Sequence, residues 1–191
     1  SSSIKIGSIV RINIHGRRVR AWVVEIAQTN EEFEVKVSEP IELSKLKSVI
    51  EYVSDGPPPH LVDFSTYLSE HYLVSPVGFL RACSPARIVK GVDYKNHTHS
   101  ETKEQKVVFV NPRADRRQIV QDNISSDGST LIVSPDSHNR IFEWLKQIRS
   151  NAILYSSENK TAEESYKRAT NNNSVILGGR ACLFAPATDV K

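Results

Sequence analysis

Hydrophobic and polar residues alternate with a period of two over residues 4–53, which is the pattern of strands with one buried face. In one of these runs Trp22, Val24 and Ile26 would share a face. No helical period interrupts the alternation, so we expect a small antiparallel β-barrel or curled sheet. The expected strands are residues 8–14, 20–27, 32–41 and 46–53.

Three consecutive prolines, residues 57–59, end this alternation, because proline favours extended backbone and cannot pair inside a sheet. Apolar residues then recur at helical spacing, which predicts a helix over 60–76 and a second, shorter helix over 77–85. Residues 91–106 are polar and aperiodic. We interpret them as a linker between two domains.

From residue 107 onward, short apolar runs alternate with amphipathic segments. This order is typical of β-α-β units, which build a parallel sheet with right-handed crossovers. Ligands of such sheets bind beyond the carboxyl ends of the strands. Thr161 and Glu164 have the spacing of a capping box at the start of the third helix. The expected strands are 107–110, 129–134, 152–156 and 174–177, and the expected helices are 113–124, 138–150 and 161–170.

Composition narrows the class of protein only slightly. The net charge is +3 and 39% of the residues are hydrophobic, which is enough for a buried core. Cys83 and Cys182 are far apart and no CxxC pair exists, so we expect two free thiols and no cysteine-based zinc site. No apolar run approaches the ~20 residues that span a membrane, and no signal peptide is evident. We therefore expect a cytoplasmic protein without a membrane partner.

The turns of the α/β part hold little that resembles an enzyme. Residues 111–117, where a phosphate-binding loop would lie, contain no glycine and no lysine. Asp136 or Ser137 is interpreted as a helix cap in preference to a catalytic group. Gly178, Gly179 and Arg180 form either an anion contact or a tight turn with an exposed arginine. We predict no catalytic residue and no metal ligand.

The clearest chemical signal is a basic cluster near the N-terminus. Residues 10–21 hold five arginines or histidines and no acidic residue. Their pattern predicts a hairpin with Gly16 in its turn. Such clustering suits phosphate binding, which indicates a DNA- or RNA-binding surface. A solvated turn in a protein-interaction module is the alternative. The expected phosphate contacts are Arg17, Arg18 and Arg20, with Arg11 as a further DNA-binding residue, and Lys45 and Lys47 add charge from another loop.

Several segments together resemble the family of PriA-type primosomal proteins, the replication-restart DNA helicases. The segment GSIVRINIHGRRVRAWVVEI resembles the glycine-centred core of the family's DNA-binding domain, and SVILGGRACLFAP resembles a segment of its helicase lobe. Three further segments match in the family's order: residues 45–85, 128–136 and 154–169.

The resemblance implies a module that binds 3′ DNA ends at arrested forks through a nucleotide pocket. Gly16 matches the family's pocket glycine and Lys47 its pocket lysine, whereas the family's upstream Phe-Asp pair has no match here. The family uses ATP with magnesium, and structural zinc in a downstream segment. Its Gly-Ser-Gly-Lys-Thr loop and winged-helix segment have no counterpart, Gly179 replaces a threonine, and its Asp-Glu-Glu-His box would fall beyond Lys191. We therefore expect no cofactor in this chain.

The expected fold is α+β. A β-barrel-like DNA-binding domain with a helix pair would occupy residues 1–90, and a partial RecA-like helicase lobe would occupy 107–191. The expected function is DNA binding in replication restart and primosome assembly, at the nucleoid, on branched or single-stranded DNA and without helicase activity. Other primosome proteins are further expected partners. An active ATP-dependent 3′-5′ helicase fragment and a protein-interaction scaffold of the primosome are the alternatives.

Overall fold

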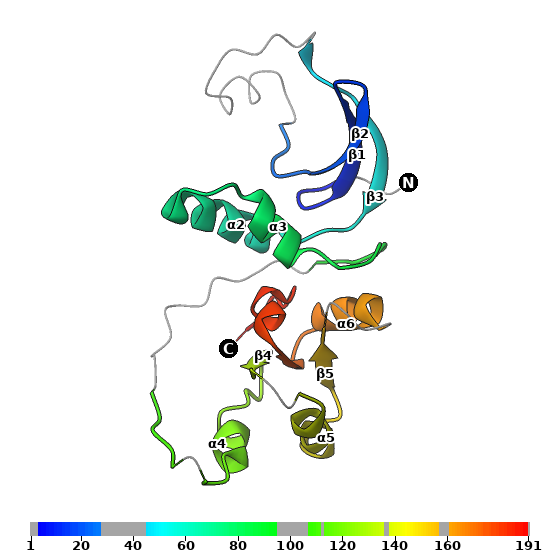
Figure 1. Ribbon diagram of the computed structural model, residues 1–191. Helices are drawn as coiled ribbons and strands as arrows, with labels where there is room; N and C mark the ends of the chain where they lie inside the picture. Colours follow the sequence, from blue (N-terminus) through cyan, green and yellow to red (C-terminus); the bar gives the residue numbers. More distant parts are fainter. Residues whose placement is uncertain are drawn as a thin grey trace. The chain divides into compact units, whose positions relative to one another are not determined.

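The computed structural model describes residues 4–27, 45–94, 107–111, 113–135, 138–156 and 161–190. The chain divides into two compact units, Ser1–Val92 and Asp93–Lys191, which we call unit 1 and unit 2 (Figure 1). Unit 1 combines an antiparallel sheet with helices, and unit 2 combines a parallel sheet with helices, so the mixed α and β composition is confirmed.

A three-stranded antiparallel sheet forms the first half of unit 1. Its strands β1 (Ile9–Ile14), β2 (Arg17–Trp22) and β3 (Val49–Ser54) lie in the order β2-β1-β3. The described strands leave the sheet open. The predicted strand over 32–41 lies outside the described residues, and a closed barrel stays a prediction.

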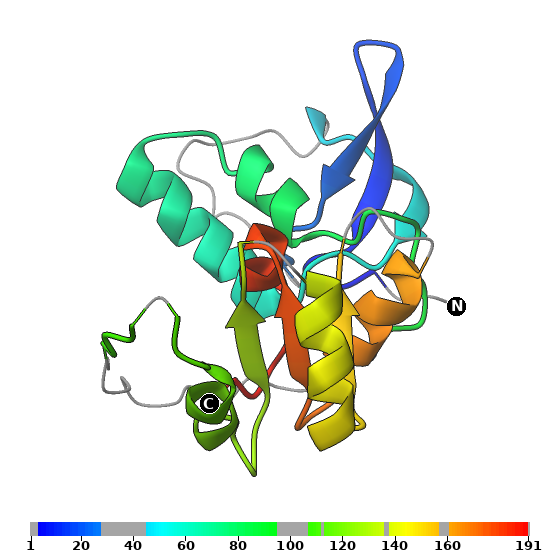
Figure 2. The same ribbon diagram turned by 60° about the horizontal axis from the view of Figure 1, so that its bottom comes forward.

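The hairpin of β1 and β2 turns at two residues with left-handed backbone, His15 at φ 49° and Gly16 at φ 79°. Two positive φ values in a two-residue loop match the right-handed twist of the flanking strands. Figure 2 shows the tip of this hairpin extending away from the helices of unit 1. Burial decreases along β1 from its start toward the tip, so side chains at the tip are exposed.

The strand β2 lies earlier in the chain than the pattern predicted. Gly7, at φ 88°, turns the chain just before β1, so the ladder ends where Ile9 pairs with Trp22. Backbone bonds between Val23 and residues 7 and 8 close this end. Val24 and Ile26 therefore lie beyond the end of β2, where they are 50% and 39% exposed, so the prediction that they share a strand face with Trp22 is wrong.

Two helices complete unit 1, namely α2 (Pro59–Tyr72) and α3 (Val77–Cys83). The helix α2 begins at the proline run. Proline is well tolerated at the first helical position, because the backbone N–H that it lacks would have no partner inside the helix there. Leu73 adopts left-handed backbone at φ 54° and ends α2 before Pro76, earlier than predicted. The buried apolar core of this unit includes Ile9, Val10, Val53, Leu61, Val62, Leu80, Cys83, Val89 and Val92.

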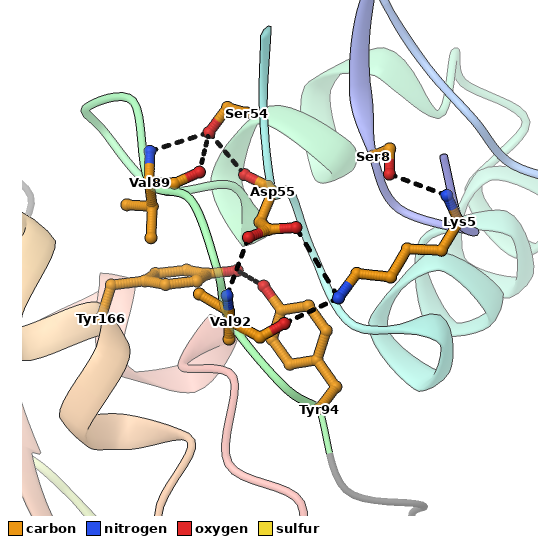
Figure 3. Close-up of polar contacts among 8 residues, drawn as sticks. All are labelled: Lys5, Ser8, Ser54, Asp55, Val89, Val92, Tyr94 and Tyr166. Carbon is orange, nitrogen blue, oxygen red and sulfur yellow. Dashed lines mark hydrogen bonds and ion pairs between the residues drawn. The ribbon is translucent and has the colours of Figure 1, made fainter. Parts of the chain in front are cut away.

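A polar anchor joins the end of β3 to the last residues of unit 1 (Figure 3). The Asp55 backbone N–H donates to the Val89 carbonyl at 2.7 Å, and the Val92 N–H donates to the Asp55 carboxylate at 2.9 Å. Lys5 Nζ donates to the Val92 carbonyl at 2.7 Å and lies 3.7 Å from the carboxylate. Burial, and then a hydrogen bond to Asp55, raises the pKa of Tyr52 above its ordinary value.

Unit 2 contains a parallel sheet whose strands β4 (Thr130–Val133), β5 (Ala152–Tyr155) and β6 (Val175–Gly178) lie in the order β4-β6-β5. Helix α5 (His138–Ile148) connects β4 to β5, and α6 (Ala162–Ala169) connects β5 to β6. The predicted β-α-β succession is confirmed for these elements. Leu145 of α5 packs against the sheet in a core with Ile124, Ala152, Val175 and Leu177.

Other predictions for unit 2 are wrong. Residues 107–110 form no strand, and Phe109 is 95% exposed, because a four-residue apolar run needs a neighbouring strand and the sheet provides none for it. The helix predicted over 113–124 is shorter, α4 (Arg117–Asp122). Thr161 makes no capping bond, since its ψ of 12° is far from the extended backbone that a capping side chain needs.

Candidate nucleic-acid interface

The register of the β1–β2 hairpin divides its arginines between two faces. Directly paired residues point to the same side of a sheet, and successive residues point to opposite sides. Arg11 pairs with Arg20 and Asn13 pairs with Arg18, so these four share one face, which we call the arginine face. Arg17 pairs with Ile14 and points to the other side. The arginines that are clustered in the sequence therefore lie on two opposite faces of the hairpin.

Arg11 differs from the other arginines because it has a carboxylate partner. It pairs in register with Glu51 of β3 on one side and with Arg20 of β2 on the other. Its guanidinium forms an ion pair with Glu51, and its side chain is only 33% exposed. The two arginines directly opposite each other repel, and Glu51 offsets part of that cost. Arg11 thus has less free charge to offer a phosphate than the sequence suggested.

Arg17, Arg18 and Arg20 are all exposed, and no carboxylate of the described residues pairs with them. Fully solvated guanidinium groups can take up phosphate oxygens without first giving up an internal partner. The strand β2 is the outer strand of the described sheet, so these side chains lie along an edge. They provide cationic donors for a backbone of phosphates.

A hollow of about 410 Å³ lies beside the hairpin tip and is lined by Asn13, Ile14, His15, Gly16 and Lys47. Lys47 reaches it because Val49 of β3 pairs with Ile12, so the chain two residues earlier runs beside Ile14. The structure thus brings together Gly16 and Lys47, two site residues that are 31 positions apart in the sequence. Sequence reasoning did not single out Asn13, Ile14 and His15 for this site.

Gly16 leaves its part of the hollow open. A Cβ built on this residue would meet no heavy atom within 4 Å, so a ligand can approach the backbone closely there. The left-handed φ of 79° gives glycine a second role, because the turn itself favours a residue without a side chain. Ile14 is 44% exposed and offers an apolar wall, while Lys47 offers a cation. This arrangement suits one nucleotide, with its base or sugar against Ile14 and its phosphate or hydroxyl near Lys47.

A comparison with known families decides what this unit is. Residues 1–85 match the family of the PriA 3′DNA-binding domain (3′BD), a range that includes the hairpin, the hollow and helices α2 and α3. Unit 1 carries a PriA-type 3′DNA-binding domain. The N-terminal region is therefore that of a PriA-type primosomal protein, and DNA is its partner. No curated protein and no solved structure matches the chain.

The second predicted site, at the carboxyl end of β6 in unit 2, has a different geometry from the hollow of the 3′DNA-binding domain. A Cβ on Gly178 would lie 2.6 Å from the Tyr155 carbonyl oxygen and 3.0 Å from Cys182 Cβ, so close packing accounts for this glycine. Gly179 has φ −78°, which any residue adopts, and Arg180 is exposed at the start of the short helix η2 (Arg180–Phe184). An anion contact there stays a prediction.

The turn at residues 111–117 places one of its arginines in an internal ion pair. Arg117 Nε donates to both carboxylate oxygens of Asp115, at 2.9 and 3.0 Å. These bonds lower the pKa of Asp115 to about 2. Arg113 and Arg116 are exposed. The turn therefore presents two solvated cations, without the cradle of backbone N–H groups that holds a nucleotide triphosphate in a glycine-rich loop.

The described residues also bear on three other predictions, which concern metal binding, membrane insertion and disulfide formation. No group of three histidine, cysteine or acidic side chains there lies close enough to hold a metal ion. None of the described helices is long and apolar enough to cross a bilayer. Cys83 and Cys182 are buried free thiols, as predicted.

Proposed function

We propose that this protein recognises DNA branches or stalled forks in replication restart by holding an exposed 3′ end in the hollow of its 3′DNA-binding domain. The observation that carries this proposal is the convergence of the Gly16 backbone, Ile14 and Lys47 on one nucleotide-sized hollow at the tip of an exposed hairpin. Arg17, Arg18 and Arg20 are exposed on β2 of the same hairpin and supply phosphate contacts that do not depend on base sequence.

Unit 2 acts in this proposal without ATP turnover. The support is chemical: the turn at 111–117 has neither the glycines that let a backbone wrap phosphate nor the lysine that reaches the outer phosphates. Arg117 is already engaged by Asp115. A helicase would need other residues to supply these contacts, so we assign unit 2 a contact or scaffolding role.

A fork-binding titration tests the proposal. Labelled forks with a free 3′ hydroxyl, or with the same end lacking that hydroxyl as a 2′,3′-dideoxynucleotide, are titrated at two salt concentrations. The unmodified protein should prefer the free end, and Lys47→Ala should reduce that preference about tenfold, the loss expected for one hydrogen bond to a charged group. Binding to forks as a class should survive, because the arginines remain.

Lys45→Ala is the matched control, since it removes the same charge two residues away and outside the hollow. It should lower affinity for both forks alike. If Lys47→Ala keeps the full preference for a free 3′ end, the hollow is not the end-binding site. ATP added to the same forks should leave them unseparated, and ATP-dependent unwinding by this chain would contradict the role given to unit 2.

A further inference from the structure

Arg18 and Arg20 of the arginine face lie on a different part of the hairpin from the hollow, which includes only Asn13 of that face. The hollow lies at the tip, on the side of β1 that faces β3 and Lys47. Arg18 and Arg20 belong to β2, on the far side of β1, and β2 lies roughly 10 Å from the line of β3, at about 4.8 Å for each strand spacing. Their side chains also leave the sheet on one face, opposite to that of Arg17.

The chemistry of the arginine face differs from that of the hollow. Proteins that hold single strands combine cations with exposed aromatic side chains on which bases stack. The arginine face carries Arg18, Arg20, Asn13 and the paired Arg11. Of the described strand residues on this side of the hairpin, the aromatic one is Trp22, which is half-buried at the base of the hairpin, where its indole N–H donates to Ser84 Oγ at 2.8 Å. The described residues of this face therefore offer contacts to phosphates and no exposed aromatic platform for unpaired bases.

The spacing along β2 suits contact with a phosphate backbone. Arg18 and Arg20 are two residues apart on an extended strand, which separates them by roughly 6.8 Å at about 3.4 Å per residue. A strand of duplex DNA carries one phosphate for about every 3.4 Å of helix axis, and the distance between neighbouring phosphates is longer because the backbone winds round that axis, so the two guanidinium groups can contact neighbouring phosphates of one strand. Asn13, directly opposite Arg18, adds an amide donor of a kind that often contacts phosphate.

We propose that the arginine face binds the phosphate backbone of a duplex arm, while the hollow takes the 3′ end beside it. This inference rests on the proposed function, because it assigns the second DNA element to a domain that already holds an end. The hairpin would then recognise a junction, because the hollow and the arginine face are both occupied only where a free 3′ end adjoins a duplex. Arg18 and Arg20 determine specificity for that structure, and Lys47 determines specificity for the end.

The experiment compares two DNAs that share one labelled strand with a free 3′ end. One is the single strand alone, and the other has a duplex arm next to that end. The variant Arg18→Gln/Arg20→Gln should bind the single strand as the unmodified protein does and bind the duplex-bearing DNA more weakly. Loss of two duplex phosphate contacts makes the salt slope shallower by about 1.8. A fourfold rise in salt should then weaken the unmodified protein about tenfold more than the variant.

Two further variants test whether the effect depends on where the removed charges lie and on charge itself. Melting curves test whether the variants are folded. Arg81→Gln/Arg87→Gln removes two exposed charges from the same unit outside the hairpin and should leave the slope unchanged. Arg18→Lys/Arg20→Lys keeps the cations and should retain most of the duplex affinity, because a lysine still neutralises a phosphate. Equal melting curves for the variants show that the hairpin is folded.

The outcomes distinguish this inference from the proposed function. If Arg18→Gln/Arg20→Gln weakens the single strand and the duplex-bearing DNA equally, the arginines follow the same strand that ends in the hollow, and the duplex contact is wrong. The end-binding function survives that result. If the arm raises affinity and the double variant keeps the full gain, another surface binds the duplex. If the unmodified protein binds neither DNA in a salt-dependent way, the proposed function itself fails.

Discussion

At the scale of single residues, Gly16 allows the turn and the binding of a ligand to be tested apart. Its left-handed φ of 79° costs an ordinary side chain about 1 kcal/mol, while the space around its missing Cβ is open. Gly16→Ala should therefore lower the free energy of unfolding by about 1 kcal/mol through the backbone alone. Asparagine tolerates this conformation, so Gly16→Asn should keep most of the stability. Urea unfolding of both variants measures the difference.

DNA binding by the same two variants shows what the open backbone is for. If the hollow takes a nucleotide, Gly16→Asn should keep the fold and still reduce the preference for a free 3′ end, because its side chain occupies the approach to the backbone. A variant that keeps both stability and preference would limit Gly16 to the turn. An unchanged free energy of unfolding for Gly16→Ala would contradict the account of the turn itself.

Residue patterns predicted the turn and the cluster of cations. They did not predict how the arginines are divided between the two faces of the hairpin. A glycine between two alternating runs is a local signal, and so is a concentration of arginines. The pairing of Arg11 with Glu51 depends on the register of strands that are 35 residues apart in the chain, from Ile14 to Val49. Period-two alternation leaves such a register open. Gly178 also required the structure, because only the position of Tyr155 shows why a side chain does not fit.

At the scale of elements, the anchor at Asp55 holds the end of β3 to the last segment of unit 1. Asp55 is 3% exposed and accepts a bond from the Val92 N–H, and it lies near Lys5. Asp55→Ala leaves the Val92 N–H without its acceptor and removes the carboxylate near Lys5, which should lower the free energy of unfolding by about 3 kcal/mol. Amide exchange at Val92, which loses its acceptor, should become faster. Asp55→Asn should cost less, because an amide oxygen still accepts.

The matched control is Asp63→Ala, which removes an exposed carboxylate from α2 in the same unit. A surface substitution of this kind usually changes stability by less than about 0.5 kcal/mol. Equal effects of the two alanine variants would show that the Asp55 contacts are not what closes this end of the domain.

Elements with strong periodicity were predictable, and short ones were not. The β-α-β order of unit 2 follows from two amphipathic helices between three apolar runs, and all five elements are present. The run at 107–110 has the same composition as those strands, yet it is exposed, since only a neighbouring strand makes an apolar tetrad into part of a sheet. Thr161 failed as a cap because sequence spacing does not specify its backbone angles.

At the scale of the whole molecule, each unit holds one fully buried thiol. Cys83 belongs to the core of unit 1 and Cys182 to that of unit 2, and both are 0% exposed. Burial raises the pKa of Cys83, and it raises the pKa of Cys182 to about 12 from an ordinary value of 9.0. The thiolate is the reactive form, so neither residue should be alkylated while its unit is folded. Each thiol therefore reports the opening of its own unit.

Alkylation in increasing urea, read by mass spectrometry at each cysteine, should yield a separate midpoint for each unit. Asp55→Ala should lower the Cys83 midpoint more than the Cys182 midpoint, because the anchor lies in unit 1. A raised pKa in the folded state means that the protonated thiol contributes stability below about pH 9, and this contribution is lost as pH rises toward 12. The midpoint of unit 2 should thus fall across that range, and far-ultraviolet circular dichroism of Cys182→Ala should show a smaller fall. Equal shifts of both thiols in Asp55→Ala would mean that the two units unfold as one.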